Sequence, residues 1–325
     1  MFAIVAAFLY NIPNIAGLYS ARLIGGTVAG INVVGGSVFL AEIFPEDISS
    51  IGGIFIYAGI AISLLVGSCQ QFILGSDFMA EYWRVFLLWP TIISIARIIL
   101  IMALIKTDTP KFYLMNKYEF MDKKREQLAL KYRLETCLSY LYEESEVGDK
   151  ADTLIADNLI QKKQTTFLEL FSKKYLYRTV VGSFLNAAQQ FSGINFLIFF
   201  STDLFNNLSG NGDLITLVIG FSNFFGCFFA IYAVEKFGKK FNFITGIILQ
   251  FIAFCCLTWG VMNKGSLIPT ISIVVYMLGY SMGLGATLVP YCAEILPPVG
   301  AGFVNAVQWV SAAIIGKMVP ILTKK

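Results

Sequence analysis

Long stretches without a charged residue restrict what this chain can fold into more than any other feature. A helix needs about 20 consecutive apolar residues to cross the hydrocarbon core of a bilayer. The stretches that reach this length are Ile48–Ser76, Thr179–Thr202, Leu214–Val234, Phe241–Asn263, Gly265–Ala293 and Ile295–Gly316. Only 14% of all residues are charged, and 57% are hydrophobic. The sequence therefore predicts an all-α polytopic membrane protein, with the lipid bilayer and not nucleic acid as its partner.

A charged segment divides the apolar stretches into two groups. Lys106–Arg178 contains 14 of the 24 Lys and Arg residues and 12 of the 21 Asp and Glu residues. Within it, Glu119–Tyr142 is typical of solvated helices joined by salt bridges. We expect nine helical spans, near residues 2–16, 18–43, 52–75, 84–105, 178–205, 213–235, 241–262, 267–295 and 303–322. The predicted domains are a partial N-terminal transmembrane half (1–105, about four spans), a charged helical loop (106–177) and a C-terminal half (178–325, about five spans).

The short segment Glu235–Lys240 indicates how the chain is oriented in the membrane. It contains three lysines between two predicted spans, and the positive-inside rule places such a segment in the cytoplasm. The chain must be on the same side two spans earlier, so the long charged loop is expected to be cytoplasmic too. The terminal Lys324 and Lys325 then fall on the far side, against the same rule.

An internal repeat predicts two parallel halves. Ala41–Pro45 (AEIFP) matches Ala293–Pro297 (AEILP), and each motif closes a glycine-rich span whose small residues let helix backbones approach closely. The glycines are Gly25, Gly26, Gly30, Gly35 and Gly36 in the first span, and Gly279, Gly283 and Gly285 in the second. A repeat in the same orientation is typical of transporters built from two halves. Aligning the halves predicts two further spans before Met1 and one after Lys325, so that about nine of twelve helices are present.

Carboxamides interrupt the apolar stretch near 180–204. Residues 189–195 have the sequence QQFSGIN, and each unpaired amide in hydrocarbon costs a few kcal/mol. Amides are neutral and both donate and accept hydrogen bonds, which suits a ligand covered in hydroxyl groups, such as a sugar. Ser192-Gly193 can loosen the helix, so that both of its ends line one cavity. The alternative is that these amides only join neighbouring helices.

Cysteine and histidine usage argues against enzymatic chemistry. The chain contains six cysteines and no histidine, and none of the cysteines has metal-ligand spacing. No nucleophile with a matching base is visible either. We therefore expect no enzyme activity, no metal and no cofactor, and we interpret the cysteines as small core residues.

Several motifs together resemble the sugar porters of the major facilitator superfamily, over nearly the whole chain and over family spans three to eleven. The run at 189–195 is similar to the Gln-Gln-x-Ser-Gly-Ile-Asn signature of span seven, the most specific match. Further matches are Ser20–Gly25 in span four, Trp83-Arg84 before span six, Thr107–Leu114 after span six, and Glu235–Lys240 after span eight. The resemblance implies a two-half helical bundle of the major facilitator type.

The resemblance also implies roles for individual residues. Substrate contacts are expected from Gln189, Gln190, Asn195, Asn223 and Gln308. Cytoplasmic salt-bridge networks that act as gates are expected from Glu42, Arg84, Glu235, Lys236, Lys239, Lys240 and Glu294. Arg22 is expected to anchor the outer end of its helix rather than touch substrate. For the lysines, an alternative is that they only set the topology.

The chain departs from the family pattern at several of these positions. Tyr57 falls where the family usually has a sugar-binding glutamine, and Ser281 falls where a glutamate is common. The Pro-x-Pro-Trp region is replaced by Ala286–Val289, and the Arg-Gly after the first AEIFP motif is replaced by Ser49-Ser50. These changes alter the walls of the expected site and the partners of its glutamates.

The sequence thus predicts transport of a sugar, a hexose such as glucose, by alternating access. Transport is expected to be facilitative or proton-coupled, in the plasma membrane, with a small-molecule sugar as substrate. Two alternatives stay open: a sugar sensor that does not transport, and an inactive fragment of a sugar transporter gene. The sequence leaves the identity of the sugar and the oligomeric state open.

Overall fold

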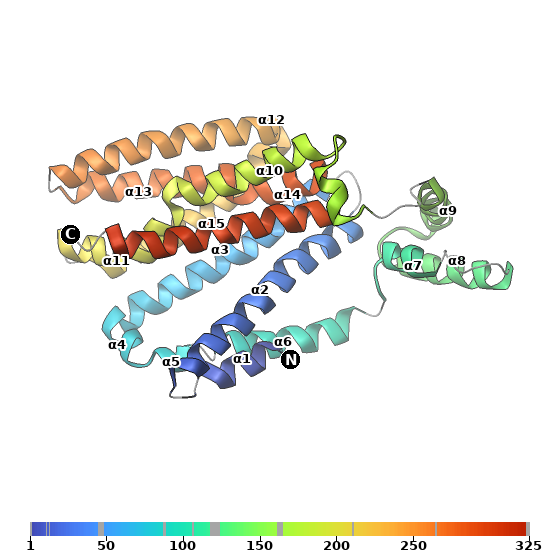
Figure 1. The fold of residues 1–325 in the computed structure, drawn as a ribbon, viewed down its shortest axis with the longest axis horizontal. Helices are drawn as coiled ribbons and strands as arrows, with labels where there is room; N and C mark the ends of the chain where they lie inside the picture. The colour runs from blue at the N-terminus through green and yellow to red at the C-terminus, as the bar shows by residue number, and fades with distance from the viewer. Residues whose placement is uncertain are drawn as a thin grey trace. The chain divides into compact units, whose positions relative to one another are not determined.

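All regular structure in the described part of the chain is helical (Figure 1). The structure is a computed structural model that describes residues 2–10, 12, 14–44, 49–86, 89–105, 107–117, 124–160, 165–209, 211–263 and 265–322. The chain forms two compact units. Unit 1 comprises Met1–Ser49 and Trp83–Gln164, and unit 2 comprises Ser50–Tyr82 and Thr165–Lys325. The predicted domain boundaries near 105 and 178 stay a prediction.

The helices of unit 1 are α1 (Phe2–Tyr10), α2 (Ile15–Ile43), α5 (Trp83–Phe86), α6 (Trp89–Leu104), α7 (Pro110–Lys117), α8 (Lys124–Leu138) and α9 (Glu144–Ile160). Those of unit 2 are α3 (Ser49–Leu74), α4 (Ser76–Glu81), the 3₁₀-helix η3 (Phe167–Phe171), α10 (Leu176–Gln189), the π-helix η4 (Gln190–Ile194), α11 (Asn195–Ser209), α12 (Gly212–Met262), α13 (Leu267–Tyr280), the π-helix η5 (Ser281–Gly285), α14 (Ala286–Ile295) and α15 (Pro298–Leu322).

The two repeated motifs end their helices in the same way. Helix α2 ends at Ile43, and the next residue, Phe44, is extended with ψ 136°. Helix α14 ends at Ile295, and Leu296 is extended with ψ 148°. Both extended residues precede a proline in the sequence, and the proline ring disfavours the helical conformation of the residue before it. Both copies of the repeat therefore end a helix at the same position of the motif.

In the described part of the charged loop, α7, α8 and α9 share a small core. Leu134 and Leu138 on α8 pack against Val147 and Ala151 on α9. On the solvated side, Lys131 Nζ lies 2.5 Å from Asp152 Oδ1. These contacts agree with the prediction of salt-bridged helices in this loop for the part of it that the structure describes. Residues 118–123 lie outside the described part.

Helix α12 is too long for one crossing and bends at Gly238. A straight helix of 51 residues would be about 76 Å long, against a hydrocarbon core of about 30 Å. Gly238 has φ 80° and ψ 168°, a conformation that favours glycine, so it separates two helical segments. Asn242 Nδ2 donates to Ala230 O at 3.3 Å across this bend. The bend occurs within the predicted loop Glu235–Lys240.

Glycines bring α12 and η5 into close contact, as the second glycine-rich span predicts. These elements lie where α12 and α13 run side by side (Figure 1). A Cβ atom built on Gly246 would lie 2.6 Å from Gly283 Cα and 2.6 Å from Gly279 O. In the first glycine-rich span, by contrast, a Cβ built at Gly26, Gly30, Gly35 or Gly36 would have no described atom within 4 Å apart from the adjacent backbone of its own helix.

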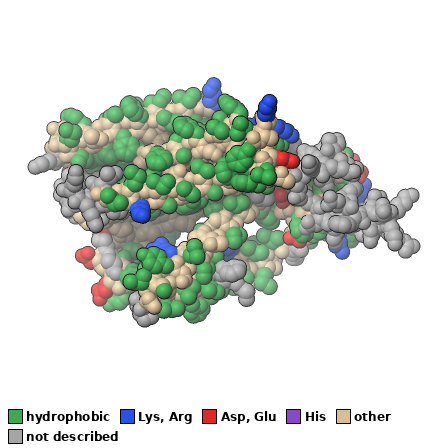
Figure 2. Space-filling view, viewed as in Figure 1, with side chains coloured by type: hydrophobic (Ala, Val, Ile, Leu, Met, Phe, Trp, Pro, Cys, Tyr) green, Lys and Arg blue, Asp and Glu red, His purple; other side chains and the backbone are tan. Residues whose placement is uncertain are grey.

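Apolar surface faces outward from the helices, as expected for helices in lipid. Figure 2 shows hydrophobic side chains over the visible face of α10, α12 and α15. Phe184 is 70% exposed and Phe251 is 71% exposed. Four helices in the described part are long and apolar enough to cross a membrane: Ile54–Leu74, Gly212–Met262, Leu267–Ile295 and Pro298–Val319. The predicted total of nine spans is therefore not confirmed, in part because α10 and α11 are interrupted by a π-helix.

Candidate functional site

The run QQFSGIN lies where a helix is broken inside unit 2. Residues 190–194 form the π-helix η4 between α10 and α11, and Gly193 has φ 95° and ψ 4°. Residues with a side chain rarely adopt this φ. A Cβ atom on Gly193 would also lie 2.5 Å from Cζ of Phe254. The structure thus confirms that Ser192-Gly193 disrupts the helix, and π-bulges are frequent at functional sites.

Hydroxyl groups attach this break to α13. Ser192 Oγ donates to Gln189 O at 2.7 Å, within its own turn. Tyr276 Oη on α13 donates to Ser192 O at 3.1 Å, and it lies 3.0 Å from Ser192 Oγ. These bonds bring side-chain hydroxyl donors to two backbone carbonyls of the irregular turn, Gln189 O and Ser192 O. The broken segment is therefore held in one position.

Gln189 joins three helical elements. Its Nε2 donates to Tyr280 Oη at 3.1 Å and to Leu284 O at 2.9 Å. Its Oε1 accepts from Gln308 Nε2 on α15 at 2.6 Å. Both ends of this buried amide are therefore occupied by protein groups. In this conformation Gln189 joins neighbouring helices through hydrogen bonds. This agrees with the alternative interpretation that the amides of the polar run only connect helices.

Gln190 and Asn195 form a pair across the π-helix. Asn195 Nδ2 donates to Gln190 Oε1 at 2.6 Å. The two side chains belong to different ends of the broken helix, and their role in lining one site stays a prediction. Gln190 is 6% exposed.

A second π-helix, η5, arranges the polar groups on the other side. Tyr280, the last residue of α13 before η5, and Leu284 within η5 accept hydrogen bonds from Gln189. The adjacent Ser281 lies 3.3 Å from the hydroxyl of Tyr57. Gln189 and Tyr57 thus contact neighbouring residues, Tyr280 and Ser281, where α13 passes into η5.

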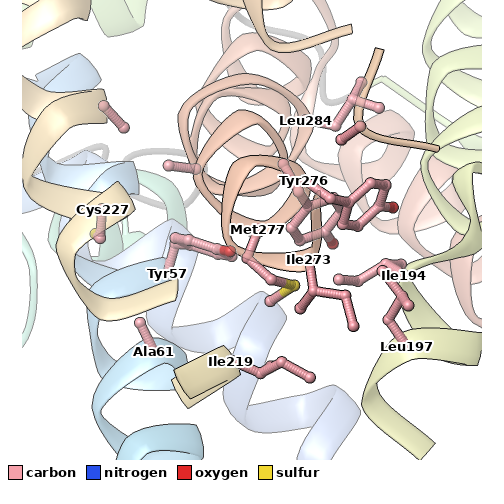
Figure 3. Packing of buried hydrophobic residues seen from close by; sticks show 14 of the residues in the cluster. Tyr57, Ala61, Ile194, Leu197, Ile219, Cys227, Ile273, Tyr276, Met277 and Leu284 are labelled. Carbon is pink, nitrogen blue, oxygen red and sulfur yellow. The ribbon is translucent and has the colours of Figure 1, made fainter. Parts of the chain in front are cut away.

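Tyr57 projects from α3 into this polar region. Its hydroxyl donates to Asn223 Oδ1 on α12 at 3.1 Å, and the tyrosine is 8% exposed. Figure 3 shows its ring directed toward Met277 on α13, with Cys227 of α12 beside it. Sequence reasoning named Tyr57 and Ser281 as departures but not as partners. The sequence signal that could have indicated this contact is that positions 57 and 281 both depart from the family pattern.

Four amide atoms of the predicted site have no hydrogen bond within the described part of the chain. Two are donors, Gln190 Nε2 and Asn223 Nδ2, and two are acceptors, Asn195 Oδ1 and Gln308 Oε1. None of the four is a fully buried unpaired atom, a state found here only for Ser201 Oγ and Asn242 Oδ1 among described side chains. The site therefore offers both donors and acceptors to a solute.

The structure brings two of the predicted gating residues together. Lys239 on α12 forms an ion pair with Glu294 on α14. The Lys239 side chain is 15% exposed and that of Glu294 is 48% exposed. This contact places the bend at Gly238 and the end of α14 at the same end of unit 2. Glu294 thus has a cationic partner although no arginine follows its motif.

The other predicted gating residues have different surroundings. Glu42 accepts from Thr109 Oγ1 at 2.6 Å within unit 1. Lys236 Nζ donates to Tyr232 Oη at 3.1 Å. Glu235 and Lys240 are exposed. The side chain of Arg84 lies outside the described part.

Arg22 is exposed and contacts an aromatic ring. Its guanidinium carbon lies 5.7 Å from the centroid of the Tyr10 ring on α1. A cation over a ring at this distance contributes about 0.5–1 kcal/mol at an exposed site. The contact joins α1 to α2 and is compatible with the predicted anchoring role.

Comparison with known proteins identifies the family that the chain matches. The profile of the family "Sugar (and other) transporter" matches residues 1–325. Hexose transporter 1 of Plasmodium falciparum (isolate 3D7) is 25% identical, over 94% of this chain and 64% of its own length. Facilitated trehalose transporter Tret1-1 of Drosophila simulans is 27% identical, over 95% of this chain and 36% of its own length.

A solved structure shows the fold. The major facilitator superfamily proton:xylose symporter XylE, bound to 6-bromo-6-deoxy-D-glucose, matches with a TM-score of 0.79 and 18% identity. The match covers 99% of this chain and 73% of that one. The fold is therefore of the major facilitator type.

The chain belongs to the sugar (and other) transporter family. The relatives that it matches are named as transporters and not as enzymes, in agreement with the expectation of no enzyme activity in this family. The chain spans 64% of the length of the Plasmodium falciparum relative.

Proposed function

We propose that this member of the sugar transporter family binds a monosaccharide and takes part in moving it across a membrane by alternating access. The observation that supports the proposal is the set of free amide atoms around the broken helix. Among the described residues, one amide atom has no hydrogen-bond partner in each of Gln190, Asn195, Asn223 and Gln308. Each sugar hydroxyl donates one hydrogen bond and accepts others, so such a mixed set can recognise it.

The neutrality of these groups favours a neutral ligand. A charged side chain facing a sugar in a low-dielectric site would add a desolvation cost without a matching charge on the ligand. Amides avoid that cost and fix the direction of each hydrogen bond. Among sugars, a hexose such as glucose is the proposed substrate, supported by the hexose transporters among the relatives. Transport is proposed to be facilitative or coupled to protons.

The proposed orientation follows from the lysines near Gly238. The positive-inside rule favours a cytoplasmic position for this end of unit 2 and for the charged loop. The ion pair between Lys239 and Glu294 then stabilises the cytoplasmic end of unit 2. We propose that this pair takes part in the gate, since rocking transporters break such contacts as they open. The plasma membrane is the proposed location.

The substitution Gln190→Ala tests the proposal. It removes the free donor Nε2 and the acceptor that Asn195 binds. In cells that express the protein that includes this chain, hexose uptake should therefore fall at least about tenfold. This factor corresponds to the loss of roughly 1.4 kcal/mol of binding free energy. Surface expression should not change.

Gln250→Ala is the matched control. Gln250 is also a buried carboxamide, 5% exposed, but its Nε2 donates to Gly246 O in its own helix. This variant should transport normally once corrected for its amount at the surface. Equal uptake by the Gln190→Ala variant and the parent would contradict the assignment of this residue to the substrate site.

A further inference from the structure

A cavity of about 320 Å³ lies in unit 1, where the ends of α2 and α6 meet α7 and α8 of the charged loop. Its volume falls at the lower end of the range of about 300–1,000 Å³ that is typical of small-molecule sites. The amide residues of the proposed sugar site all belong to unit 2. The cavity is therefore a second candidate site, with a lining of its own.

Hydrogen bonds join the elements that surround this cavity. Thr109 Oγ1, just before α7, donates to Glu42 Oε2 near the end of α2 at 2.6 Å. Cys137 Sγ on α8 donates to Asp108 O at 3.1 Å, and it accepts from Thr107 Oγ1 at 3.8 Å. These bonds connect α2 and α8 to the same short segment between α6 and α7. The walls of the cavity are thus held in place by the protein itself, as in most ligand sites.

One wall of the cavity is apolar and continues onto exposed side chains. It includes Phe39 and Ile43 of α2, Leu104 of α6 and the following Ile105. Leu104 is 74% exposed and Ile105 is 40% exposed. Both residues end the predicted span 84–105, so an apolar chain that is dissolved in the bilayer can reach the cavity along them.

The other wall is polar and contains Thr107, Asp108, Cys137 and Tyr140. Asp108 is the only charged residue among the described residues that line the cavity. Its ionised carboxylate only accepts hydrogen bonds, so it selects a ligand head that donates one and disfavours an anionic head. Asp108 is also exposed, and an ion pair with an exposed carboxylate contributes little. A neutral hydroxyl therefore satisfies this wall without the desolvation cost of a charged head.

We propose that this cavity binds a small neutral amphiphile whose hydroxyl head donates to Asp108 and whose single apolar chain lies against Phe39, Ile43 and Leu104. The volume suits a chain of medium length and not a phospholipid with two long chains. The occupant would fill the space between the loop helix α8 and the ends of α2 and α6. The site is independent of the proposed sugar site.

Photolabelling with a diazirine derivative of octanol tests this inference. The chain is placed in lipid nanodiscs and irradiated, and the labelled residues are identified by mass spectrometry. Label should appear within residues 104–110 and 137–141, and unlabelled octanol should compete for it. Octanoate has the same chain length but an anionic head that cannot donate. It should compete at least about threefold more weakly, as expected for the loss of one hydrogen bond.

Two variants and a control locate the site. Asp108→Ala removes the carboxylate but keeps the backbone oxygen that Cys137 binds, so the affinity for octanol should fall about threefold to tenfold. Asp149→Ala is the matched control, because Asp149 is also exposed in the charged loop but is not among the residues that line the cavity. Leu141→Trp places a larger side chain in the cavity wall and should abolish labelling of residues 104–110.

The results separate the inference from its alternatives. Label that spreads over the lipid-facing helices and is not displaced by octanol would overturn the inference, because the alcohol would then only be dissolved in the surrounding lipid. Equal competition by octanol and octanoate, or unchanged octanol affinity in Asp108→Ala, would overturn it as well. Displacement of the label by glucose would assign the label to the sugar site instead. If Leu141→Trp does not fold, the result for Asp108→Ala decides, since this side chain is exposed and its loss should not unfold the protein.

Discussion

Gly193→Ala is the substitution whose effect can be worked out most fully from the structure. Gly193 has φ 95° within η4, and a residue with a Cβ atom in a left-handed conformation costs about 1–2 kcal/mol. The new methyl group would lie 2.5 Å from Cζ of Phe254, and overpacking of this kind costs typically 1–3 kcal/mol. The two effects together predict a loss of about 2–5 kcal/mol in stability.

Heating the detergent-solubilised protein and measuring the fraction that stays monodisperse would detect this loss as a lower melting temperature. Gly302→Ala on α15 is the control, because a Cβ at that helical position would have no described atom within 4 Å apart from the adjacent backbone of its own helix. It should be neutral or stabilising by up to about 1 kcal/mol. In Gly193→Ala combined with Phe254→Ala, comparison with Phe254→Ala alone should show only the conformational part of the loss. A melting temperature of Gly193→Ala equal to that of the parent would refute the reasoning.

Two further predictions concern ionisable groups. Lys239 and Glu294 are each replaced by alanine, singly and together, and the free energy of unfolding is compared in a double-mutant cycle. The coupling energy should be about 0–1 kcal/mol, because Glu294 is half exposed. A coupling energy above about 3 kcal/mol would show a buried pair instead. Burial raises the pKa of the Cys137 thiol, with the hydrogen bond to Thr107 acting in the opposite direction. In a variant with Cys137 as its only cysteine, maleimide labelling should therefore be slow at neutral pH and keep accelerating beyond pH ~8.5, whereas a plateau at or below that pH would contradict the raised pKa.

The local features of the fold could be predicted from short sequence patterns. The break at Gly193 follows from Ser-Gly within an apolar run, and the bend at Gly238 lies in a charged loop between two apolar stretches. The ends of α2 and α14 follow from the proline after each repeat. In each case the cause lies within a few residues of the effect.

Long-range contacts could not be predicted in this way. The hydrogen bond from Tyr57 to Asn223 joins residues 166 positions apart, and that to Ser281 joins residues 224 positions apart. No local propensity specifies such a pairing, which depends on how α3, α12 and η5 pack. For the same reason, the sequence indicated that Gln189 is polar and functional but not that both ends of its amide are occupied by protein groups.

Equilibrium binding of labelled glucose to the purified chain in lipid nanodiscs tests the central claim most directly. If the free amide atoms around η4 form a sugar site, binding should be saturable and displaced by unlabelled glucose, and it should be lost when Gln190 and Asn195 are both replaced by alanine. Gln250→Ala should bind as the parent does. Absence of saturable binding, or binding that persists in the double variant, would contradict the claim.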